Sequence, residues 1–296
     1  EAAEPPRLFA LPAARGHPAA LVEFDPRAAC FYLASEYDNV LRARYDRHGR
    51  YDDRQTAPYR FGLHTRPILH EYAALLGEAL QRRFPALEPQ LPAAAVRYTL
   101  DLDQPWRYRH KPPWVQAAAF ARRCLRGQAA GAREQWQAWR SGWDPYDIYP
   151  RLMRQLPPAR TRVFFLMGGR HRYDNRFSAD HPKLLALIRR FQAQGYGMGV
   201  HPSYTTWLRP DRLRRETDHL AAVLNLRITC ARQHYLRYRL PDTRRHLLAA
   251  GIREDFTTVS PYYAGFKHGL AVPFPFYDLA GEEITSLLLH PTHLMD

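Results

Sequence analysis

The sequence of 296 residues contains few lysines and few cysteines. Its lysines are Lys111, Lys183 and Lys267 alone, so arginine carries nearly all of the formal net charge of +14. The three cysteines stand far apart and form no Cys-x-x-Cys pair. This pattern argues against a disulfide framework and against a zinc ribbon. We therefore expect a reducing, cytoplasmic setting.

Long hydrophobic runs and a concentrated basic block are also missing. No apolar run approaches the ~20 residues that a membrane-spanning helix needs, and the first residues lack the basic-then-apolar order of a signal peptide. The arginines are scattered, apart from pairs such as Arg122–Arg123 and Arg214–Arg215. We expect no membrane span and no nucleic-acid partner, although so basic a protein would attract an anionic polymer. Composition leaves the oligomeric state open.

Two regions follow one another along the chain. Residues 1–95 form an N-terminal region in which one helix is predicted from Ile68 to Leu80 by apolar residues at helical spacing, with Pro85 ending it. From residue 96 to 296, short apolar strands alternate with amphipathic helices. The expected strands are Val96–Leu100, Val163–Met167, Tyr196–Val200, Arg227–Cys230, Ile252–Phe256, Ala271–Phe274 and Ile284–Leu289.

Helices are expected between these strands, at Pro182–Gln194, Pro210–Leu224 and Asp242–Ala250. Residues 114–156 form a longer insertion that is helical at first and then rich in Trp, Tyr and Pro. Alternation of strands and helices predicts βα units and a parallel sheet or barrel. We therefore expect an α/β barrel preceded by a smaller α+β region, with the boundary near residue 95.

Reactive side chains cluster where the expected strands end. The carboxyl ends of parallel barrel strands converge on one mouth, where barrel enzymes keep their active sites. The candidate residues at these ends are Asp101, Asp103, His201, Arg232, His234 and Asp255.

Asp101 and Asp103 are two residues apart, so in a strand both carboxylates project to the same face. Two adjacent carboxylates repel unless a metal ion or a shared proton lies between them. A solvated pair closing a strand, with Asp103 capping the turn before Pro105, would look the same in the sequence. Asp-x-Asp also occurs in glycosyltransferases that bind a nucleotide-sugar through a divalent ion. This third interpretation requires a nucleotide-binding fold ahead of the motif, which the sequence does not indicate.

His201 and His234 could each be an ordinary hydrogen-bonded histidine. Together with a carboxylate, however, two imidazoles make a suitable ligand set for zinc, with one position left for water. Arg232 is a surface residue by default, but it could also hold an aspartate ionised and oriented.

The order of these motifs resembles that of the NodB-like polysaccharide deacetylases. The residues that carry the likeness include Thr99–Asp103, Gly199–Tyr204, Arg232–Leu236 and Gly251–Thr257. A bacterial branch with its own N-terminal extension is the most similar, through stretches such as Phe24–Arg50, Asp144–Asp147, Phe164–Asp174, Gly265–Gly269, Pro273–Leu279 and Met295–Asp296. The resemblance implies a distorted (β/α) barrel of about seven strands and a divalent metal, usually zinc. It also implies removal of acetyl groups from N-acetylated sugars of a polysaccharide or glycan precursor.

The resemblance also implies roles for single residues. Asp101 corresponds to the catalytic base and Asp103 to a metal ligand, although the two roles could be exchanged. Known relatives have two adjacent aspartates there, and Leu102 separates them here. The second motif normally holds two histidines four residues apart, and here Thr205 replaces the second. We expect His234 to supply the missing imidazole.

Two further roles follow from the third and fourth motifs. Arg232 matches the arginine that positions the base. Asp255 matches the acid that braces either that arginine or the acidic histidine. Members of this branch continue to a closing strand that carries a histidine as general acid. The printed sequence stops at Asp296, so we expect an incomplete barrel and leave the acid unassigned. A catalytically inactive, carbohydrate-binding barrel is the alternative function.

Overall fold

The computed structural model describes residues 8–9, 22, 24–41, 43–90, 93–169, 171–174 and 177–295. The chain divides into two compact units. The first unit comprises residues 1–95, 206–214 and 229–296, and the second comprises 96–205 and 215–228. The C-terminal part of the chain thus belongs to the same unit as the N-terminal region. A division into domains at residue 95 stays a prediction.

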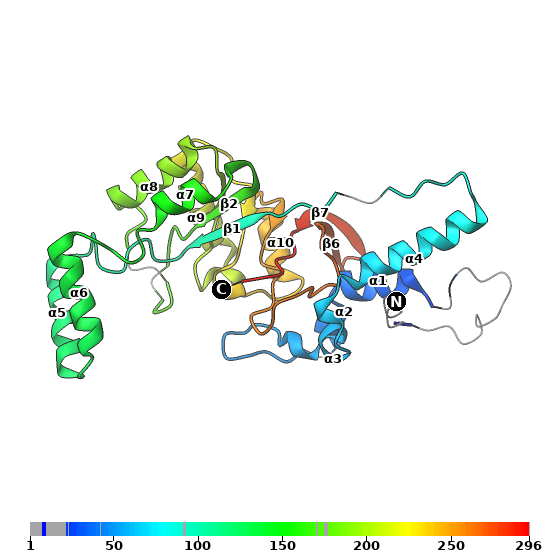
Figure 1. Ribbon diagram of the computed structural model, residues 1–296, viewed down its shortest axis with the longest axis horizontal. Helices are drawn as coiled ribbons and strands as arrows, with labels where there is room; N and C mark the ends of the chain where they lie inside the picture. The colour runs from blue at the N-terminus through cyan, green and yellow to red at the C-terminus, as the bar shows by residue number, and fades with distance from the viewer. Residues whose placement is uncertain are drawn as a thin grey trace. The chain divides into compact units, whose positions relative to one another are not determined.

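The second unit contains three parallel strands, and Figure 1 draws the first two of them side by side. They are β1 (Tyr98–Leu102), β2 (Thr161–Phe165) and β3 (Gly197–Val200), and β2 lies between the other two. The register pairs Asp101 with Phe164 and Phe165 with Val200. Parallel pairing of strands separated by helices is the arrangement that the sequence pattern predicted.

Helices cover this sheet because their apolar residues recur at helical spacing. In α8 (Pro182–Ala193), four buried side chains recur three or four residues apart, namely Leu184, Leu187, Ile188 and Phe191. The Phe191 ring packs against Phe165 of β2 at 6.0 Å between centroids. Complete burial of Phe164 and Phe165 makes β2 the core strand of this unit.

The insertion after β1 folds into three helices, α5 (Pro113–Leu125), α6 (Ala129–Ser141) and α7 (Tyr149–Gln155). Helical structure therefore extends through the Trp-rich part of the insertion, where the sequence suggested only a helical beginning. Gly142, with φ of +67°, ends α6 in the left-handed conformation that glycine adopts without strain.

The first unit contains the remaining strands, which pair in the order β4-β5-β7-β6. Their bounds are Cys230–Ala231 for β4, Glu254–Asp255 for β5, Phe274–Asp278 for β6 and Glu283–Leu289 for β7. Pairing is parallel from β4 through β7, whereas β6 is antiparallel to β7 and carries a bulge between Pro275 and Tyr277. The backbone amides of Arg253 and Glu254 both donate to the carbonyl oxygen of Thr229, at the start of the paired segments β4 and β5.

The helices of the first unit include α1 (Pro26–Ala34), α2 (Tyr37–Leu41), α3 (Ala57–Arg60), α4 (Ile68–Arg83) and α10 (Asp242–Ala249). Their main core joins α1 to α4 through Ala29, Leu33, Ile68, Leu69 and Tyr72. The predicted helices near Ile68 and Asp242 are therefore present, as is α9 (Pro210–Leu224).

Seven strands occur among the described residues, as expected, and they are mostly parallel. The described strands of neither unit close on themselves, because β1 pairs only with β2 and β6 only with β7. The described residues therefore have a mixed α/β fold. They do not show the closure of the sheet into the barrel that the sequence predicted. Asp296, on which the expectation of an incomplete chain rests, lies outside the described residues.

Candidate functional site

The carboxyl end of β1 carries the Asp-x-Asp motif. Leu102, between the two aspartates, is 6% exposed and belongs to the core, whereas both carboxylates are partly exposed. This is the alternation that a strand imposes on successive side chains. That Asp101 and Asp103 share one face stays a prediction, while the apolar residue between them anchors the end of the strand.

His201 follows β3 directly, and the backbone places it beside Asp103. Its amide donates to the carbonyl oxygen of Phe165 at 2.8 Å, which extends the β2–β3 ladder by one residue. Its side chain is 3% exposed, and Nε2 lies 2.9 Å from Oδ1 of Asp103, whose side chain is 48% exposed. Because β1 and β3 flank β2 in parallel, their carboxyl ends bring these two residues together.

A layer of buried acids holds the loop that follows His201. Asp174 accepts the amide of His171 through one carboxylate oxygen at 2.8 Å and the amide of Tyr204 through the other at 2.7 Å. Glu216 of α9 accepts both the amide of Ser203, at 2.8 Å, and its hydroxyl, at 2.5 Å. These bonds fix the backbone on the carboxyl side of His201.

Burial raises the pKa of Glu216, and the two bonds from Ser203 oppose this effect only in part. The sequence analysis did not single out Glu216, because a glutamate in an amphipathic helix ordinarily faces solvent. The sequence feature related to Glu216 is Gly168. A side chain at this position would place a Cβ within 2.5 Å of the Glu216 carboxylate, so glycine leaves room for it.

Aromatic side chains near His201 pack against one another. The Tyr204 ring stacks on His171 with 4.3 Å between centroids and 9° between planes, and Tyr173 approaches the same ring at 4.9 Å. Tyr204 is 8% exposed. It therefore acts first as a packing residue of this loop.

Trp207 and Tyr235, which like Tyr204 are aromatic residues that could stack on a sugar ring, also have neighbours in their own unit. The guanidinium carbon of Arg237 lies 4.4 Å from the Trp207 ring centroid, and that of Arg239 lies 5.3 Å from it. Tyr235 contacts the His48 ring at 5.0 Å and the His234 ring at 4.8 Å. Packing within the protein accounts for the positions of the Tyr204, Trp207 and Tyr235 rings as well as sugar binding would.

His234 lies in the first unit, in a short 3₁₀ turn after β4, and is 3% exposed. The two residues that follow it, Tyr235 and Leu236, have φ values of 60° and 54°. Left-handed backbone at bulky residues is unfavourable, so the surrounding structure must hold this turn in place. Strain of this kind is often found at functional sites.

Arg232 and Asp255 are both buried in the first unit. Arg232 donates to the carbonyl of Phe256 at 3.0 Å and to the hydroxyl of Thr292 at 2.9 Å. Asp255 accepts the amide of Thr257 at 2.9 Å. Arg232 is therefore a buried residue and not the surface arginine of the default interpretation.

The ion partner of Asp255 within its unit is Arg244, with 3.8 Å between Nε and Oδ2. This arginine comes from α10 and was not anticipated. Burial raises the pKa of Asp255 despite the positive charge of Arg244. The expected pairing of Arg232 with Asp101 or Asp255 stays a prediction.

Of the three metal ligands that the sequence predicted, the second unit brings Asp103 and His201 together. Asp103 and His201 belong to the second unit and His234 to the first. The pair formed within one unit is therefore the structural core of the candidate site, and the role of His234 is part of the proposal below.

His290 and His293 come close to the C-terminus of the described chain. His290 Nε2 lies 2.9 Å from Glu254 Oε2, and its ring stacks on Phe256 at 4.1 Å. His293 contacts the carbonyl of Leu270 at 3.1 Å. These contacts account for both side chains structurally, and neither is assigned as the general acid.

A buried charged cluster in the first unit was not foreseen. Glu36 receives hydrogen bonds from Tyr238 and Arg244. Lys267 Nζ lies 3.6 Å from the Glu36 carboxylate and 2.8 Å from that of Asp53. Its members are widely separated in the chain, so no local motif could have revealed it.

The pKa values in this cluster shift in opposite directions. Burial alone would raise the pKa of Glu36, but Arg244 and Lys267 lower it well below its ordinary value of 4.5. Burial raises the pKa of Asp53, in spite of its contact with Lys267.

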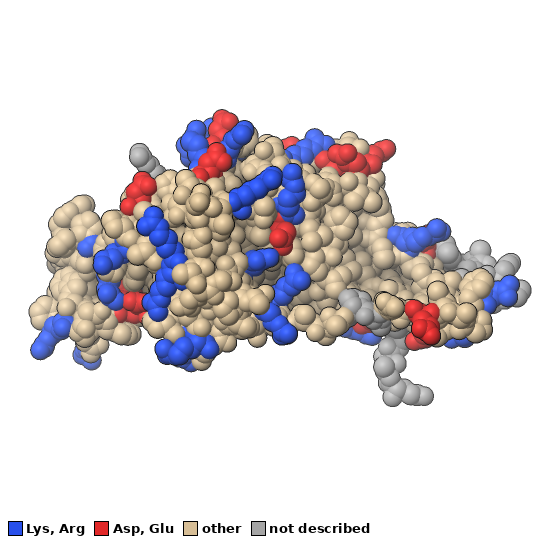
Figure 2. All heavy atoms as spheres, turned by 90° about the horizontal axis from the view of Figure 1, so that it is seen from above, with Lys and Arg blue, Asp and Glu red and all other residues tan. Residues whose placement is uncertain are grey.

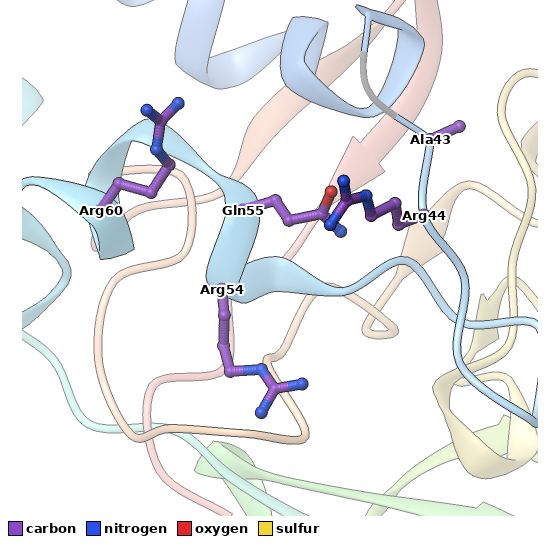
Figure 3. Close-up of a pocket in the computed structure, with 5 residues that line it drawn as sticks. All are labelled: Ala43, Arg44, Arg54, Gln55 and Arg60. Atoms are coloured by element: carbon purple, nitrogen blue, oxygen red, sulfur yellow. The ribbon is translucent and has the colours of Figure 1, made fainter.

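A pocket of about 650 Å³ in the first unit is lined by Ala43, Arg44, Arg54, Gln55 and Arg60. Figure 3 shows Arg44 and Gln55 pointing toward one another, while Arg54 and Arg60 point in different directions. Arg54 is moreover paired with Asp52 at 2.8 Å. The guanidinium groups do not converge on one position, and the pocket contains none of the predicted catalytic residues.

Comparison with known proteins gives one partial family match. Residues 4–85 match the model of a family of unknown function, DUF7033. This segment lies within residues 1–95, which the sequence analysis separated as an N-terminal region. The match covers less than half of the chain. No curated protein matches the sequence.

Among solved structures, a candidate polysaccharide deacetylase from Mycobacterium smegmatis is similar over 70% of this chain, with 17% sequence identity and a TM-score of 0.37. The similarity covers 63% of that protein, so this chain spans less than two thirds of its length. A likeness of this size carries no argument about fold or activity. Separately, none of the helices in the described part of the chain is both long and apolar enough to cross a membrane.

Proposed function

We propose that this protein is a metal-dependent hydrolase that removes acetyl groups from N-acetylated sugars of a polysaccharide or glycan precursor. The observation that carries the proposal is the contact between Asp103 and His201, 2.9 Å apart at the carboxyl ends of parallel strands. The motif order that resembles the NodB-like deacetylases supports the same reaction.

Asp103, His201 and His234 would hold the metal. A carboxylate oxygen and two imidazole nitrogens suit a divalent ion, and zinc is the best match to this ligand set. The Asp103–His201 pair fits, because one oxygen and one ring nitrogen already lie close together on a partly exposed edge. When bound, such an ion polarises a carbonyl oxygen and lowers the pKa of water to ~7.

Asp101 would act as the base. It lies in β1, two residues before Asp103, and would take a proton from a reactant held next to the metal. Arg232, buried in the first unit, would keep the carboxylate of the base ionised and oriented. Asp255 would brace this arrangement through the buried network that includes Arg244.

The supporting residues explain how the loop could keep its geometry during turnover. Asp174 and Glu216 bind three backbone amides and one hydroxyl around His201. Bonds to such fixed acceptors limit movement of the ligand-bearing segment.

Metal content and acetate release test the proposal separately. The purified chain should bind one divalent ion, and Asp103→Ala, His201→Ala and His234→Ala should each lower the bound metal. Asp180→Ala is a matched control, since Asp180 also faces a histidine, with 3.3 Å to His219, in the same unit. It should leave the metal content unchanged.

Acetate release from N-acetylated oligosaccharides then tests the reaction. Release that depends on the metal is the expected result. Metal binding together with glycan binding but without acetate release would favour the inactive, carbohydrate-binding alternative. Unchanged metal content in all three ligand variants would refute the site itself.

A further inference from the structure

The helical pair α5–α6 leaves one side uncovered. Figure 1 shows the two helices side by side, and they follow β1 in the chain. No residue of α5 is buried, although the helix is 13 residues long and mostly apolar. A surface helix of a globular protein normally buries an apolar stripe against its neighbours. The distribution of side chains around α5 and α6 therefore needs explanation.

One side of α5 packs against α6. Phe120 lies 5.3 Å from Trp139 and 6.3 Å from Trp136, measured between ring centroids. The buried Gln135 of α6 donates to the carbonyl of Gln116 at 2.8 Å. These contacts hold the two helices together as a hairpin and account for its inner side.

The outer side of α5 carries a second apolar stripe, which the described part of the chain leaves exposed. Trp114 is 73% exposed and Leu125 is 89% exposed. Three alanines at helical spacing connect them along the same side, and all three are exposed, namely Ala117, Ala118 and Ala121. The stripe is narrow and shallow, with a large apolar group at each end.

The hairpin that carries this stripe is basic. The hairpin from Pro113 to Ser141 contains five arginines and one acidic residue, Glu134, for a net charge of +4. Four of these arginines are exposed and form no ion pair with another described residue, namely Arg122, Arg126, Arg133 and Arg140. Glu134 is engaged by Tyr108, whose hydroxyl donates to it at 3.1 Å. The charge of the hairpin is therefore almost entirely positive.

We infer that the α5–α6 hairpin, residues 113–141, binds the surface of a membrane that contains anionic lipids. Trp114 and Leu125 would enter the boundary between headgroups and acyl chains, and the four exposed arginines would contact lipid phosphates. A basic amphipathic helix with Trp and Leu on its apolar side is the arrangement that suits this interface. Binding would be peripheral, because helices of 13 residues are too short to span a bilayer.

Charge and shape favour a lipid surface over other occupants. A second copy of this chain would bring its own +4 hairpin, and the like charges would repel. Alanine side chains offer no deep groove for a protein anchor, whereas a flat lipid interface requires none. The inference does not depend on the proposed deacetylase reaction, because no residue of the hairpin belongs to the candidate site.

Vesicle flotation tests the inference. The full chain should float with vesicles of phosphatidylglycerol and phosphatidylcholine, and should not float with vesicles of phosphatidylcholine alone. High salt should release it, because the attraction between arginines and phosphates is screened. The double variant Trp114→Ser/Leu125→Ser should weaken binding by at least about tenfold, since two large apolar groups no longer enter the interface.

Two controls separate the hairpin from general effects. Leu294→Ser removes another exposed leucine, 78% exposed, outside the hairpin and should leave binding unchanged. Arg122→Gln/Arg126→Gln should weaken binding more than Arg151→Gln/Arg154→Gln, which changes the net charge equally at exposed arginines of α7. Thermal melting should show that all variants remain folded, because every substituted side chain is exposed.

Several outcomes would overturn the inference. These are no binding to anionic vesicles, equal binding to neutral vesicles, or equal losses in the hairpin and control variants. If the double variant instead converted a dimer to a monomer without affecting vesicles, the stripe would be an interface between copies. Loss of binding to a soluble glycan, with vesicle binding intact, would assign the tryptophan to a sugar instead.

Discussion

At the scale of single residues, the candidate chemistry depends on β1, where Asp101 and Asp103 flank the buried Leu102. The two carboxylates have separate roles in the proposed reaction. Asp103 lies beside His201, and Asp101 precedes Asp103 by two residues, which is the repeat of a β-strand. Substituting them one at a time therefore separates binding of the metal from removal of a proton.

Asp101→Asn should lower the rate of acetate release by ~10²–10⁴-fold, because an amide cannot accept the proton that a carboxylate takes. The metal content should stay at the level of the unsubstituted protein. Asp103→Asn is the matched comparison and should lose metal. If Asp101→Asn lost the metal and Asp103→Asn kept it, the two roles would be exchanged.

Gly169 is a second position where one residue governs the site. Its φ is +93°, and a Cβ would come within 2.3 Å of the Asp174 carboxylate and 2.7 Å of the Ser203 side chain. Gly169→Ala should therefore disturb the acid that holds the loop after His201. We expect a loss of roughly 1–3 kcal/mol in the free energy of unfolding, measured by denaturant titration.

Gly142→Ala provides the control for Gly169→Ala. Gly142 has a φ of +67°, but nothing lies within 4 Å of the added Cβ. It should show the cost of the left-handed backbone alone, about 1 kcal/mol. Equal losses in the two variants would mean that the contact with Asp174 has no energetic consequence.

At the scale of secondary-structure elements, a buried ionic network fastens α10 to the segment before α2. Arg244 of α10 is 1% exposed and bonds to Glu36, while Lys267 reaches the same carboxylate from a third segment. A paired buried charge is tolerated, but removing one partner leaves the others uncompensated. Glu36 is the member shared by all of these contacts.

Glu36→Gln should lower the free energy of unfolding by ~3–5 kcal/mol, because it removes the carboxylate that Arg244 and Lys267 share and leaves these buried cations with Asp255 and Asp53 alone. Glu71→Gln is the matched control, since Glu71 pairs with Arg66 in the same unit at 2.8 Å with side chains 24% and 39% exposed. A partly exposed pair should contribute at most about 1 kcal/mol. A similar small loss in both variants would contradict the structural role given to Glu36.

The pH dependence of stability follows from the pKa shift of Glu36. Its pKa in the folded protein is well below the ordinary value of 4.5, because Arg244 and Lys267 outweigh the effect of burial. This contribution is fully present above the ordinary value and is lost as the pH falls toward the folded value. The unsubstituted protein should therefore lose stability below pH ~4.5 more steeply than Glu36→Gln.

Denaturant titrations over this acidic range measure the difference. The comparison is made between the two proteins because other carboxylates also titrate there. Burial raises the pKa values of Asp53 and Asp255, so their protonation acts in the opposite sense. Parallel stability curves for the two proteins would show that Glu36 has no lowered pKa.

At the scale of the whole molecule, the formal net charge is +14. On the face that Figure 2 draws, Lys and Arg side chains are separated by neutral surface, with Asp and Glu among them. A field of this kind attracts anionic polymers without recognising a sequence. This supports the expectation that an anionic glycan would be attracted more strongly than a neutral one.

Binding to an anionic polysaccharide such as dextran sulfate should therefore weaken steeply between ~0.05 and ~0.5 M salt, as the Debye length shortens from ~14 to ~4 Å. Neutral dextran, under the same conditions, should show no such binding. Fluorescence anisotropy with labelled polymers measures both. Tight binding that persisted in high salt would indicate a specific site instead of a diffuse field.

The sequence by itself determined the local structure and the identity of the candidate ligands. Apolar residues at helical spacing predicted α4, α8 and α9, because a helix must place one side against a core. Asp101 and Asp103 were found because a strand directs alternate residues to one face. Each of these inferences needs only neighbours in the chain.

Tertiary structure alone decided which distant residues meet. The contact of Asp103 with His201, the support from Glu216, and the cluster of Glu36, Arg244 and Lys267 join residues that lie far apart in the sequence. Burial also reversed ordinary expectations, since charged residues are usually solvated and these are not. The free energy of burying a charge depends on the partners that surround it in space, and the order of residues along the chain does not specify those partners.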